Sequence, residues 1–381
     1  MLNKYIAKII AISLLFSASL TACSTPSKTP KPEKTTVELP STFNNQRPDS
    51  KSNTVSRENT KVDLAQYAKP AVVKITNGLT GTATWSGKTY QLSAIFSGSG
   101  FFINPDGYIV TNAHVTEASQ NPDKFRAMLF ENYVQQLAQD YGSSFNDVFN
   151  NPEVTQQFNQ SLQLQSINNV ILPNGTTLPF EAKLAGKPVG EGKDVSIIKV
   201  ETKNAPVLKL GNSDEVNVSD SIKTFGYPGS GDSVVLNQQS LYKATTSSGE
   251  IAAKKESREG SPILQISASV APGSSGGPVI NSKSEVIGIV TFAGNPVNNQ
   301  QNFGSGFAVP SNTILEFVKQ AGITNEEGLV NRVYREGLEL YMQGQFNQAI
   351  EKFEQVKRLY INHSEVDELI RESQEKIIAR Q

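Results

Sequence analysis

The chain has 381 residues, which is long enough for two domains or for one large domain with appendages. Its formal net charge of −1 argues against a nucleic-acid partner. The single cysteine, Cys23, excludes a disulfide bond within the chain, and with only two histidines the sequence predicts no metal site and no cofactor.

Residues 1–22 are typical of a secretory signal peptide. Lys4 and Lys8 flank the start of an apolar run that ends at Leu20, too short to cross a bilayer, which needs about 20 residues. The next residues, Leu-Thr-Ala-Cys, resemble a bacterial lipobox, in which the cysteine is acylated. This predicts a lipid anchor at Cys23 in the bacterial cell envelope, and Ser24 favours the outer membrane or the cell surface. A plain cleaved signal with an incidental cysteine is the alternative.

Residues 23–62 are rich in Ser, Thr, Pro, Lys and Asn and have scarcely any large apolar side chains. Such a segment cannot bury enough surface to order itself, so we expect a disordered tether. Order begins near Val62 with a short amphipathic turn, and residues 70–75 read as the first strand. Trp85, Tyr90 and Leu92 then predict a hairpin.

His114 follows a segment with β-hairpin chemistry. A Pro-Asp-Gly turn at 105–107 separates two β-prone stretches, and Tyr108 and Val110 predict a strand that ends at the histidine. A strand end would hold the imidazole rigidly, as a catalytic base requires, although a buried core histidine is the commoner use. The other histidine, His363, is expected to be a solvated turn residue.

Residues 121–168 show helical spacing in a Gln/Asn-rich background. Phe125, Leu129 and Tyr133 recur every fourth residue, and Val154 and Phe158 do so again. We expect a helical insertion that packs on the surrounding β-structure. A lid or docking surface near the entrance of an active-site cleft, limiting access for folded substrates, is the alternative.

Asp194 opens a β-branched run that includes Val195 and Ile197. An aspartate at the head of a buried strand is costly unless a hydrogen-bond donor faces it, so the position predicts a partner. An ordinary loop carboxylate is the alternative, because residues 190–193 read as a loop.

The run Val-Ala-Pro-Gly-Ser-Ser-Gly-Gly-Pro-Val at 270–279 has the composition of a nucleophile loop. A serine hydroxyl is a weak nucleophile and needs a base and a cluster of amides that receives the oxyanion. Gly273 and Gly276 allow a tight turn that directs the amides of Gly273 and Ser275 at one spot. Ser275 is therefore the predicted nucleophile and Gly273, Ser274 and Ser275 the predicted oxyanion hole; a Gly/Ser-rich surface turn is the alternative.

In chain order, His114, Asp194 and Ser275 follow the trypsin fold and not subtilisin or the α/β-hydrolases. The nucleophile loop matches the pattern Gly-x-Ser-Gly-Gly-Pro, and the chain from about residue 63 to 318 resembles the bacterial HtrA (Deg) branch of trypsin-like serine peptidases. The segments that carry the resemblance are 98–115, 194–200, 226–229, 273–290 and 306–312.

The resemblance implies a mostly β peptidase domain at 63–320. It would consist of two six-stranded antiparallel β-barrels, one at about 63–205 with the helical insertion 121–168 and one at about 206–312. The catalytic triad His114, Asp194 and Ser275 would lie in the cleft between the barrels.

The same resemblance implies a serine endopeptidase that hydrolyses unfolded or exposed envelope polypeptides. The strand near residue 290 would pair with the substrate, with the Thr291 hydroxyl near Asp194 and with Phe292 and Ala293 along the primary pocket. Ser269 and Val270 stand where the family places the pocket floor. Neither is a carboxylate, so we expect cleavage after small or medium apolar residues.

Residues 321–381 predict a helical tail with the spacing of one tetratricopeptide repeat, carried by Gly337, Phe346, Ala349 and Phe353. One repeat cannot bury its own face, so residues 364–378 are expected to add a capping helix. HtrA proteins commonly carry a PDZ domain here, for which the tail is too short. Residues 330–381 either bind a protein partner or a second copy, or cap the barrel. A catalytically latent chaperone or partner-binding protein that uses this tail is the alternative function.

Overall fold

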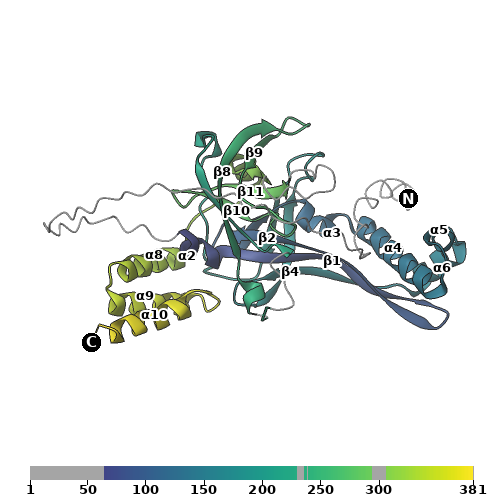
Figure 1. Ribbon diagram of the computed structural model, residues 1–381, viewed down its shortest axis with the longest axis horizontal. Coiled ribbons are helices and arrows are strands. Elements are labelled where there is room, and N and C mark those ends of the chain that lie inside the picture. Colours follow the sequence, from purple (N-terminus) through teal and green to yellow (C-terminus); the bar gives the residue numbers. More distant parts are fainter. Residues whose placement is uncertain (1–63, 230–235, 238, 294–305, 381) are drawn as a thin grey trace, which may run out of the picture. The chain divides into compact units, whose positions relative to one another are not determined.

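The computed structural model describes residues 64–229, 236–237, 239–293 and 306–380 (Figure 1). The predicted signal peptide, Cys23 and the tether lie outside these residues. Within the described part, no helix combines the length and the apolar character that a bilayer crossing requires.

Two closed barrels of six antiparallel strands form the centre of the fold, as predicted. The strand order is β1-β2-β3-β6-β5-β4 in the first barrel and β10-β11-β12-β9-β8-β7 in the second. The first barrel comprises β1 (Val72–Trp85), β2 (Lys88–Phe102), β3 (Tyr108–Thr111), β4 (Gln163–Ile171), β5 (Thr177–Ala185) and β6 (Ser196–Val200). The second comprises β7 (Ser221–Gly226), β8 (Thr245–Glu256), β9 (Pro262–Ile266), β10 (Pro278–Asn281), β11 (Val286–Ala293) and β12 (Gly306–Pro310).

The strand at His114 ends earlier than predicted. β3 pairs with β2 and β6 only as far as Thr111, and His114 begins a short 3₁₀ turn, His114–Thr116. The chain leaves the sheet here because Asn112 turns its side chain to the carbonyl of Asp194 (2.8 Å) and Ala113 adopts helical dihedrals. The histidine is therefore held by a buried turn just beyond the strand.

The insertion forms four helices, α3 (Glu117–Gln120), α4 (Pro122–Tyr141), α5 (Phe145–Phe149) and α6 (Pro152–Ser161). The helices end at Ser161, so the predicted range 121–168 is too long. Residues 163–168 belong to β4, where they pair with β1 and close the first barrel.

The insertion packs on the outer half of the β1–β2 hairpin, beside which α4 and α6 lie in Figure 1. Leu129 and Tyr133 are fully buried and share a hydrophobic cluster with Tyr90 of β2. The Tyr133 hydroxyl donates to the carbonyl of Thr84 (2.9 Å), and the Tyr90 hydroxyl donates to Asp140 (2.8 Å). The β1–β2 hairpin and the insertion helices therefore share one hydrophobic core.

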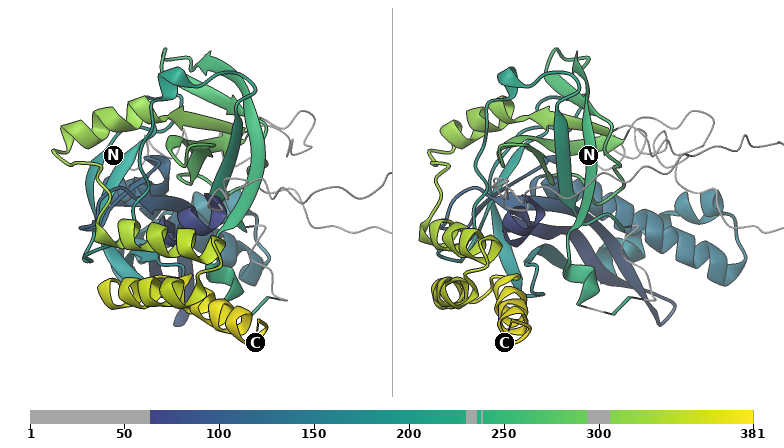
Figure 2. Two further views of the ribbon diagram at one scale, coloured as in Figure 1. Left: turned by 90° about the vertical axis from the view of Figure 1, so that its left-hand side faces the viewer. Right: turned by 60° about the vertical axis from the view of Figure 1, so that its left-hand side comes forward.

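Three helices make up the tail, α8 (Leu329–Met342), α9 (Phe346–Leu359) and α10 (Val366–Ile378), and α9 contacts both of the others (Figure 2). Gly337 lets α8 and α9 approach, since a Cβ there would lie 2.6 Å from the Phe353 ring. The other helical elements of the described residues are α2 (Leu64–Ala68), Lys69–Ala71, Ser213–Glu215, Ser240–Tyr242 and α7 (Ser311–Gln320).

The tail shares a hydrophobic core with the barrels, and Asn331 binds the segment that connects them. The side chain of Asn331 is buried, donates to the carbonyl of Val207 (2.7 Å) and accepts from the amide of Val207 (3.0 Å). Tyr334 donates to the carbonyl of Gln66 (3.0 Å). A side-chain amide thus satisfies both backbone groups of a residue in the segment that connects the barrels.

His363 is buried, contrary to the prediction of a solvated turn residue. Only 5% of it is exposed, and its ring packs edge-on against Tyr334 with 4.3 Å between centroids. Neither ring nitrogen has a hydrogen-bond partner among the described residues. Because a charged ring here would lose its hydration, burial lowers the pKa of His363 to about 3.

Acid should weaken the docking of the tail through His363. Its folded-state pKa of about 3 lies below the value of 6.5 for an unfolded chain, so the unfolded state binds more protons as the pH falls through 6.5. Between pH 7.5 and pH 5 this costs about 2 kcal/mol of unfolding free energy. His363→Phe keeps the ring contact and cannot be protonated. Urea unfolding at both pH values should show a smaller pH dependence for the variant by that amount, and parallel curves would refute the assignment.

Candidate active site

The nucleophile loop connects β9 to β10 and is held between the two barrels. Its turn is closed by hydrogen bonds from the amide of Ser274 to the carbonyl of Ala271 (2.9 Å) and from the amide of Gly277 to the carbonyl of Ser274 (3.0 Å). The amide of Ser99, on β2, donates to the carbonyl of Ser275 (2.7 Å). The first barrel therefore grips the residue that the sequence predicts as nucleophile.

Asp194 is 1% exposed and accepts three hydrogen bonds through its carboxylate. Oδ1 accepts from the His114 amide (3.0 Å), and Oδ2 lies 2.8 Å from His114 Nδ1 and accepts from the Thr291 hydroxyl (2.6 Å). A buried carboxylate needs such donors, and the sequence had predicted one. With Nδ1 donating to Asp194, the other ring nitrogen, Nε2, is left as an acceptor.

Ser275 joins this cluster through Thr291 and not directly through the imidazole. Its hydroxyl donates to the Thr291 carbonyl (2.9 Å), and no hydrogen bond links it to His114 in the described part of the chain. Asp194 thus contacts both His114 and Thr291 directly, and Ser275 is linked to this cluster through the carbonyl of Thr291 on β11.

The amide of Gly273 points away from the second barrel. The Pro272 carbonyl accepts from the Gly229 amide (2.8 Å), and in a trans peptide the carbonyl and the following N–H point in opposite directions. The amides of Gly273 and Ser275 donate to no acceptor among the described residues. Two backbone donors are therefore available beside the Ser275 hydroxyl.

The Ser274 amide is not free to donate to an oxyanion, although the sequence analysis includes Ser274 in the oxyanion hole. Its amide donates to the Ala271 carbonyl at 2.9 Å, which closes the turn and uses the only N–H that it has. The prediction failed here because the glycine pattern shows that the loop turns tightly without showing which amide closes the turn.

Ser99 is the polar residue of this site that sequence reasoning missed. It is 0% exposed, its hydroxyl donates to the carbonyl of Gly273 (2.7 Å), and it accepts from the amide of Tyr227 (2.8 Å). The available signal was a serine between two glycines, Gly98 and Gly100, just before the apolar run Phe-Phe-Ile at 101–103.

The predicted pocket residues are only partly brought together. Val270 is buried in the core of the second barrel against β12, where a Cβ on Gly306 would lie 2.4 Å from its side chain. Ser269 is exposed, and its amide donates to the Ser247 hydroxyl (3.0 Å). The side chains of Phe292 and Ala293 lie outside the described part of the structure, although both residues belong to β11.

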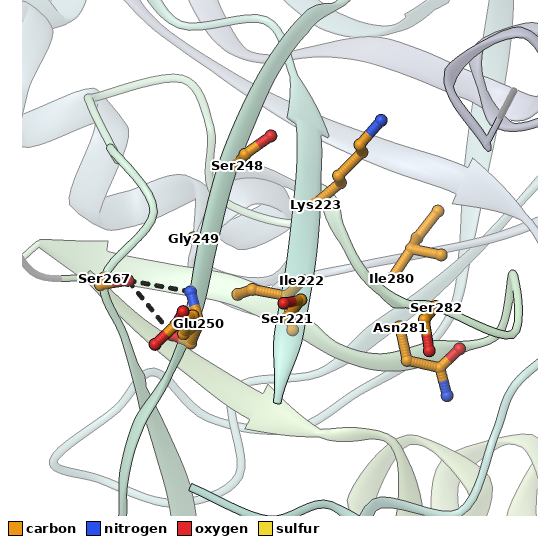
Figure 3. A pocket seen from close by; sticks show the side chains of 10 residues that line it. All are labelled: Ser221, Ile222, Lys223, Ser248, Gly249, Glu250, Ser267, Ile280, Asn281 and Ser282. Atoms are coloured by element: carbon orange, nitrogen blue, oxygen red, sulfur yellow. Dashed lines mark hydrogen bonds between the residues drawn. The ribbon is translucent and has the colours of Figure 1, made fainter. Parts of the chain in front are cut away.

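A pocket of about 490 Å³ lies on the second barrel, and none of the predicted pocket residues lines it (Figure 3). It is lined mainly by polar residues of β7, β8 and β10, and the hydrogen bond from the Glu250 amide to Ser267 (2.9 Å) borders it. No residue of the predicted triad contributes to it. Among the described residues, no group of three or more His, Cys, Asp or Glu side chains could hold a metal ion.

Gly276 should tolerate no side chain. Its φ is +85°, and a Cβ would lie 2.0 Å from the Ser99 carbonyl oxygen and 2.2 Å from the Thr111 hydroxyl. Gly142, at φ +61° with no atom within 4 Å of a Cβ, carries the dihedral cost alone. We expect Gly142→Ala to lower the unfolding free energy by about 1–2 kcal/mol and Gly276→Ala by at least about 3 kcal/mol. Equal losses in urea unfolding would show that the loop yields to the added methyl.

Comparison with known proteins identifies relatives of this chain. A family profile described as "Trypsin-like peptidase domain" matches residues 98–289, which is half of the chain. A protein named "Probable periplasmic serine endoprotease DegP-like", from Pseudomonas putida (strain GB-1), is 26% identical over 249 residues, which are 64% of this chain and 38% of that protein. "Serine protease HTRA1A" of Danio rerio is 28% identical over 230 residues, 60% of this chain and 35% of that protein.

The chain thus spans less than two fifths of the length of each of these relatives. A solved structure described as "HtrA-type protease AlgW with decapeptide" aligns over 68% of this chain and 66% of that chain, with a TM-score of 0.44 and 18% identity. On the match of the family profile over half of its length, the chain belongs to the trypsin-like peptidase domain family.

Proposed function

We propose that this protein is a serine endopeptidase of the HtrA type, with Ser275 as nucleophile, His114 as general base and Asp194 as the group that orients His114. The observation that carries the proposal is the buried carboxylate of Asp194, which grips both the backbone and the ring of His114 beside a loop with two free amides. A histidine oriented by a buried carboxylate and free amides in the loop of the serine supply the base and the oxyanion site that acyl transfer through a serine requires.

The proposed reaction begins when the Ser275 hydroxyl turns from the Thr291 carbonyl to Nε2 of His114. Oγ attacks the scissile carbonyl carbon while its proton passes to Nε2, and the amides of Gly273 and Ser275 receive the oxyanion. The protonated imidazole, stabilised by Asp194, gives the proton to the leaving amine. Water then hydrolyses the acyl-enzyme by the same transfers in reverse.

The substrates that we propose are unfolded or exposed polypeptides. An extended substrate can donate a main-chain N–H to the Thr291 carbonyl, the group that the Ser275 hydroxyl occupies. Substrate binding would thereby release the hydroxyl toward His114. An extracytoplasmic place in the bacterial envelope, with a lipid on Cys23, is proposed from the lipobox and from the periplasmic relatives.

A second candidate function rests on the same hydrogen bond. The donation from Ser275 to Thr291 instead of His114 favours, as the second candidate, a latent protease fold that binds partners, with the tail at 330–381 as the proposed contact surface. The two candidates differ in whether substrate releases Ser275, and this can be measured directly.

The test is degradation of casein, an unfolded protein, by the full chain in detergent at neutral pH. We expect cleavage by the wild type, none by Ser275→Ala, and a fall in rate of about 10⁴-fold for Asp194→Asn, which presents the wrong partner to the ring. Failure of the wild type to cut casein or to react at Ser275 with a fluorophosphonate, while folded, would favour the latent binding protein.

The primary pocket should favour small or medium apolar residues. Ser269 and Val270 offer no carboxylate, so a lysine or arginine side chain would find no opposite charge there. We expect a chromogenic peptide ending in valine to be cut at least about 10-fold faster, in kcat/KM, than the same peptide ending in arginine. Faster cleavage of the arginine peptide would refute this assignment of the pocket, and Ser275→Ala controls for contaminating proteases.

A further inference from the structure

Ser99, on β2 of the first barrel, forms hydrogen bonds with four residues in three other segments of the chain. Its amide donates to the Ser275 carbonyl (2.7 Å), and its carbonyl accepts from the Thr111 hydroxyl (2.7 Å). Its hydroxyl donates to the Gly273 carbonyl (2.7 Å) and accepts from the Tyr227 amide (2.8 Å). No part of Ser99 is exposed to solvent. The hydroxyl therefore has a fixed orientation and cannot exchange its partners for water.

The conformation of Gly273 depends on the two peptide groups that flank it. The peptide before it is fixed by the hydrogen bond from the Gly229 amide to the Pro272 carbonyl. The peptide after it is fixed by Ser99 at the carbonyl and by Ala271 at the Ser274 amide. Gly273 itself has no Cβ to restrict it and sits at φ +97°, so these external bonds decide where its amide points.

We propose that Ser99 is a positioning residue for the oxyanion hole: its hydroxyl holds the Gly273 carbonyl so that the Gly273 amide stays directed at the oxyanion. The inference rests on the proposed peptidase function, and it assigns a role to a residue that never touches the substrate. Loss of the hydroxyl leaves the Tyr227 amide and the Gly273 carbonyl buried without partners, which drives the loop to rearrange.

Ser311 provides a matched control. It is also 0% exposed, and its hydroxyl also donates to a glycine carbonyl, that of Gly211, at 2.7 Å. It lies at the start of α7, and within the described part of the chain its hydroxyl forms no hydrogen bond to the nucleophile loop. Ser99→Ala and Ser311→Ala therefore remove the same chemical group at the same burial, and only the first removes it from Gly273.

The experiment compares peptide hydrolysis by the full-length variants. For Ser99→Ala we expect kcat to fall about 10- to 100-fold with KM within about twofold, because an oxyanion donor acts mainly in the transition state. Affinity for a peptide boronic acid, which places an oxygen in the oxyanion hole, should fall by the same factor as kcat/KM. Affinity for the product peptide should stay within about twofold. Ser311→Ala should keep every value within about twofold of the wild type.

Two outcomes would overturn the inference. One is a Ser99→Ala variant whose kcat stays within about twofold of the wild type, and the other is an equal loss in Ser311→Ala, which would indicate a general effect of buried hydroxyls.

Hydrogen exchange separates failure of the inference from failure of the proposed function. A folded wild type that neither hydrolyses peptides nor reacts with a fluorophosphonate refutes the peptidase function. Faster exchange in residues 271–277 of Ser99→Ala than of Ser311→Ala would still support the positioning of the loop, and identical exchange would refute it.

Discussion

The burial of one negative charge, Asp194, organises the site. Its carboxylate has no access to water, so it must be satisfied by protein donors, and these come from both barrels: the backbone and ring of His114 from the first and the hydroxyl of Thr291 from the second. Moving either barrel would leave the carboxylate short of a donor at a cost of about 1–3 kcal/mol or more. The hydrogen bonds that offset the cost of burying the Asp194 carboxylate therefore also fix the position of His114.

The second constraint is the space around the nucleophile loop. Gly273 and Gly276 lie so close to neighbouring backbone that a Cβ would be 2.4 Å from the Tyr227 carbonyl oxygen and 2.0 Å from the Ser99 carbonyl oxygen. Such close packing lets the first barrel hold the loop by backbone and side-chain hydrogen bonds of Ser99. A loop made flexible by its glycines is thus kept rigid by its surroundings, and its two free amides keep one direction.

Sequence patterns predicted the elements that depend on residues close together in the chain. Alternating β-branched residues predicted the strands, and the glycine spacing predicted the nucleophile loop. The position of Asp194 before a buried strand predicted that a hydrogen-bond donor would face its carboxylate. Sequence patterns could not predict features that depend on contacts between segments far apart in the sequence. The burial of His363 depends on Tyr334, the role of Ser99 depends on a carbonyl 174 positions along the chain, and the end of the insertion depends on the pairing of β4 with β1.

The helical tail differs from an appended module in what it supplies to the first barrel. Asn331 satisfies both backbone groups of Val207, in the segment that connects the two barrels, and Tyr334 binds the carbonyl of Gln66 before the first strand. Removal of the tail would leave these backbone groups without partners and would expose the part of the barrel core that Val330 and Leu338 complete. A truncated chain would thus lose stability and tail function together. Substitutions on the exposed face of α10, which leave these contacts in place, can separate partner binding from capping.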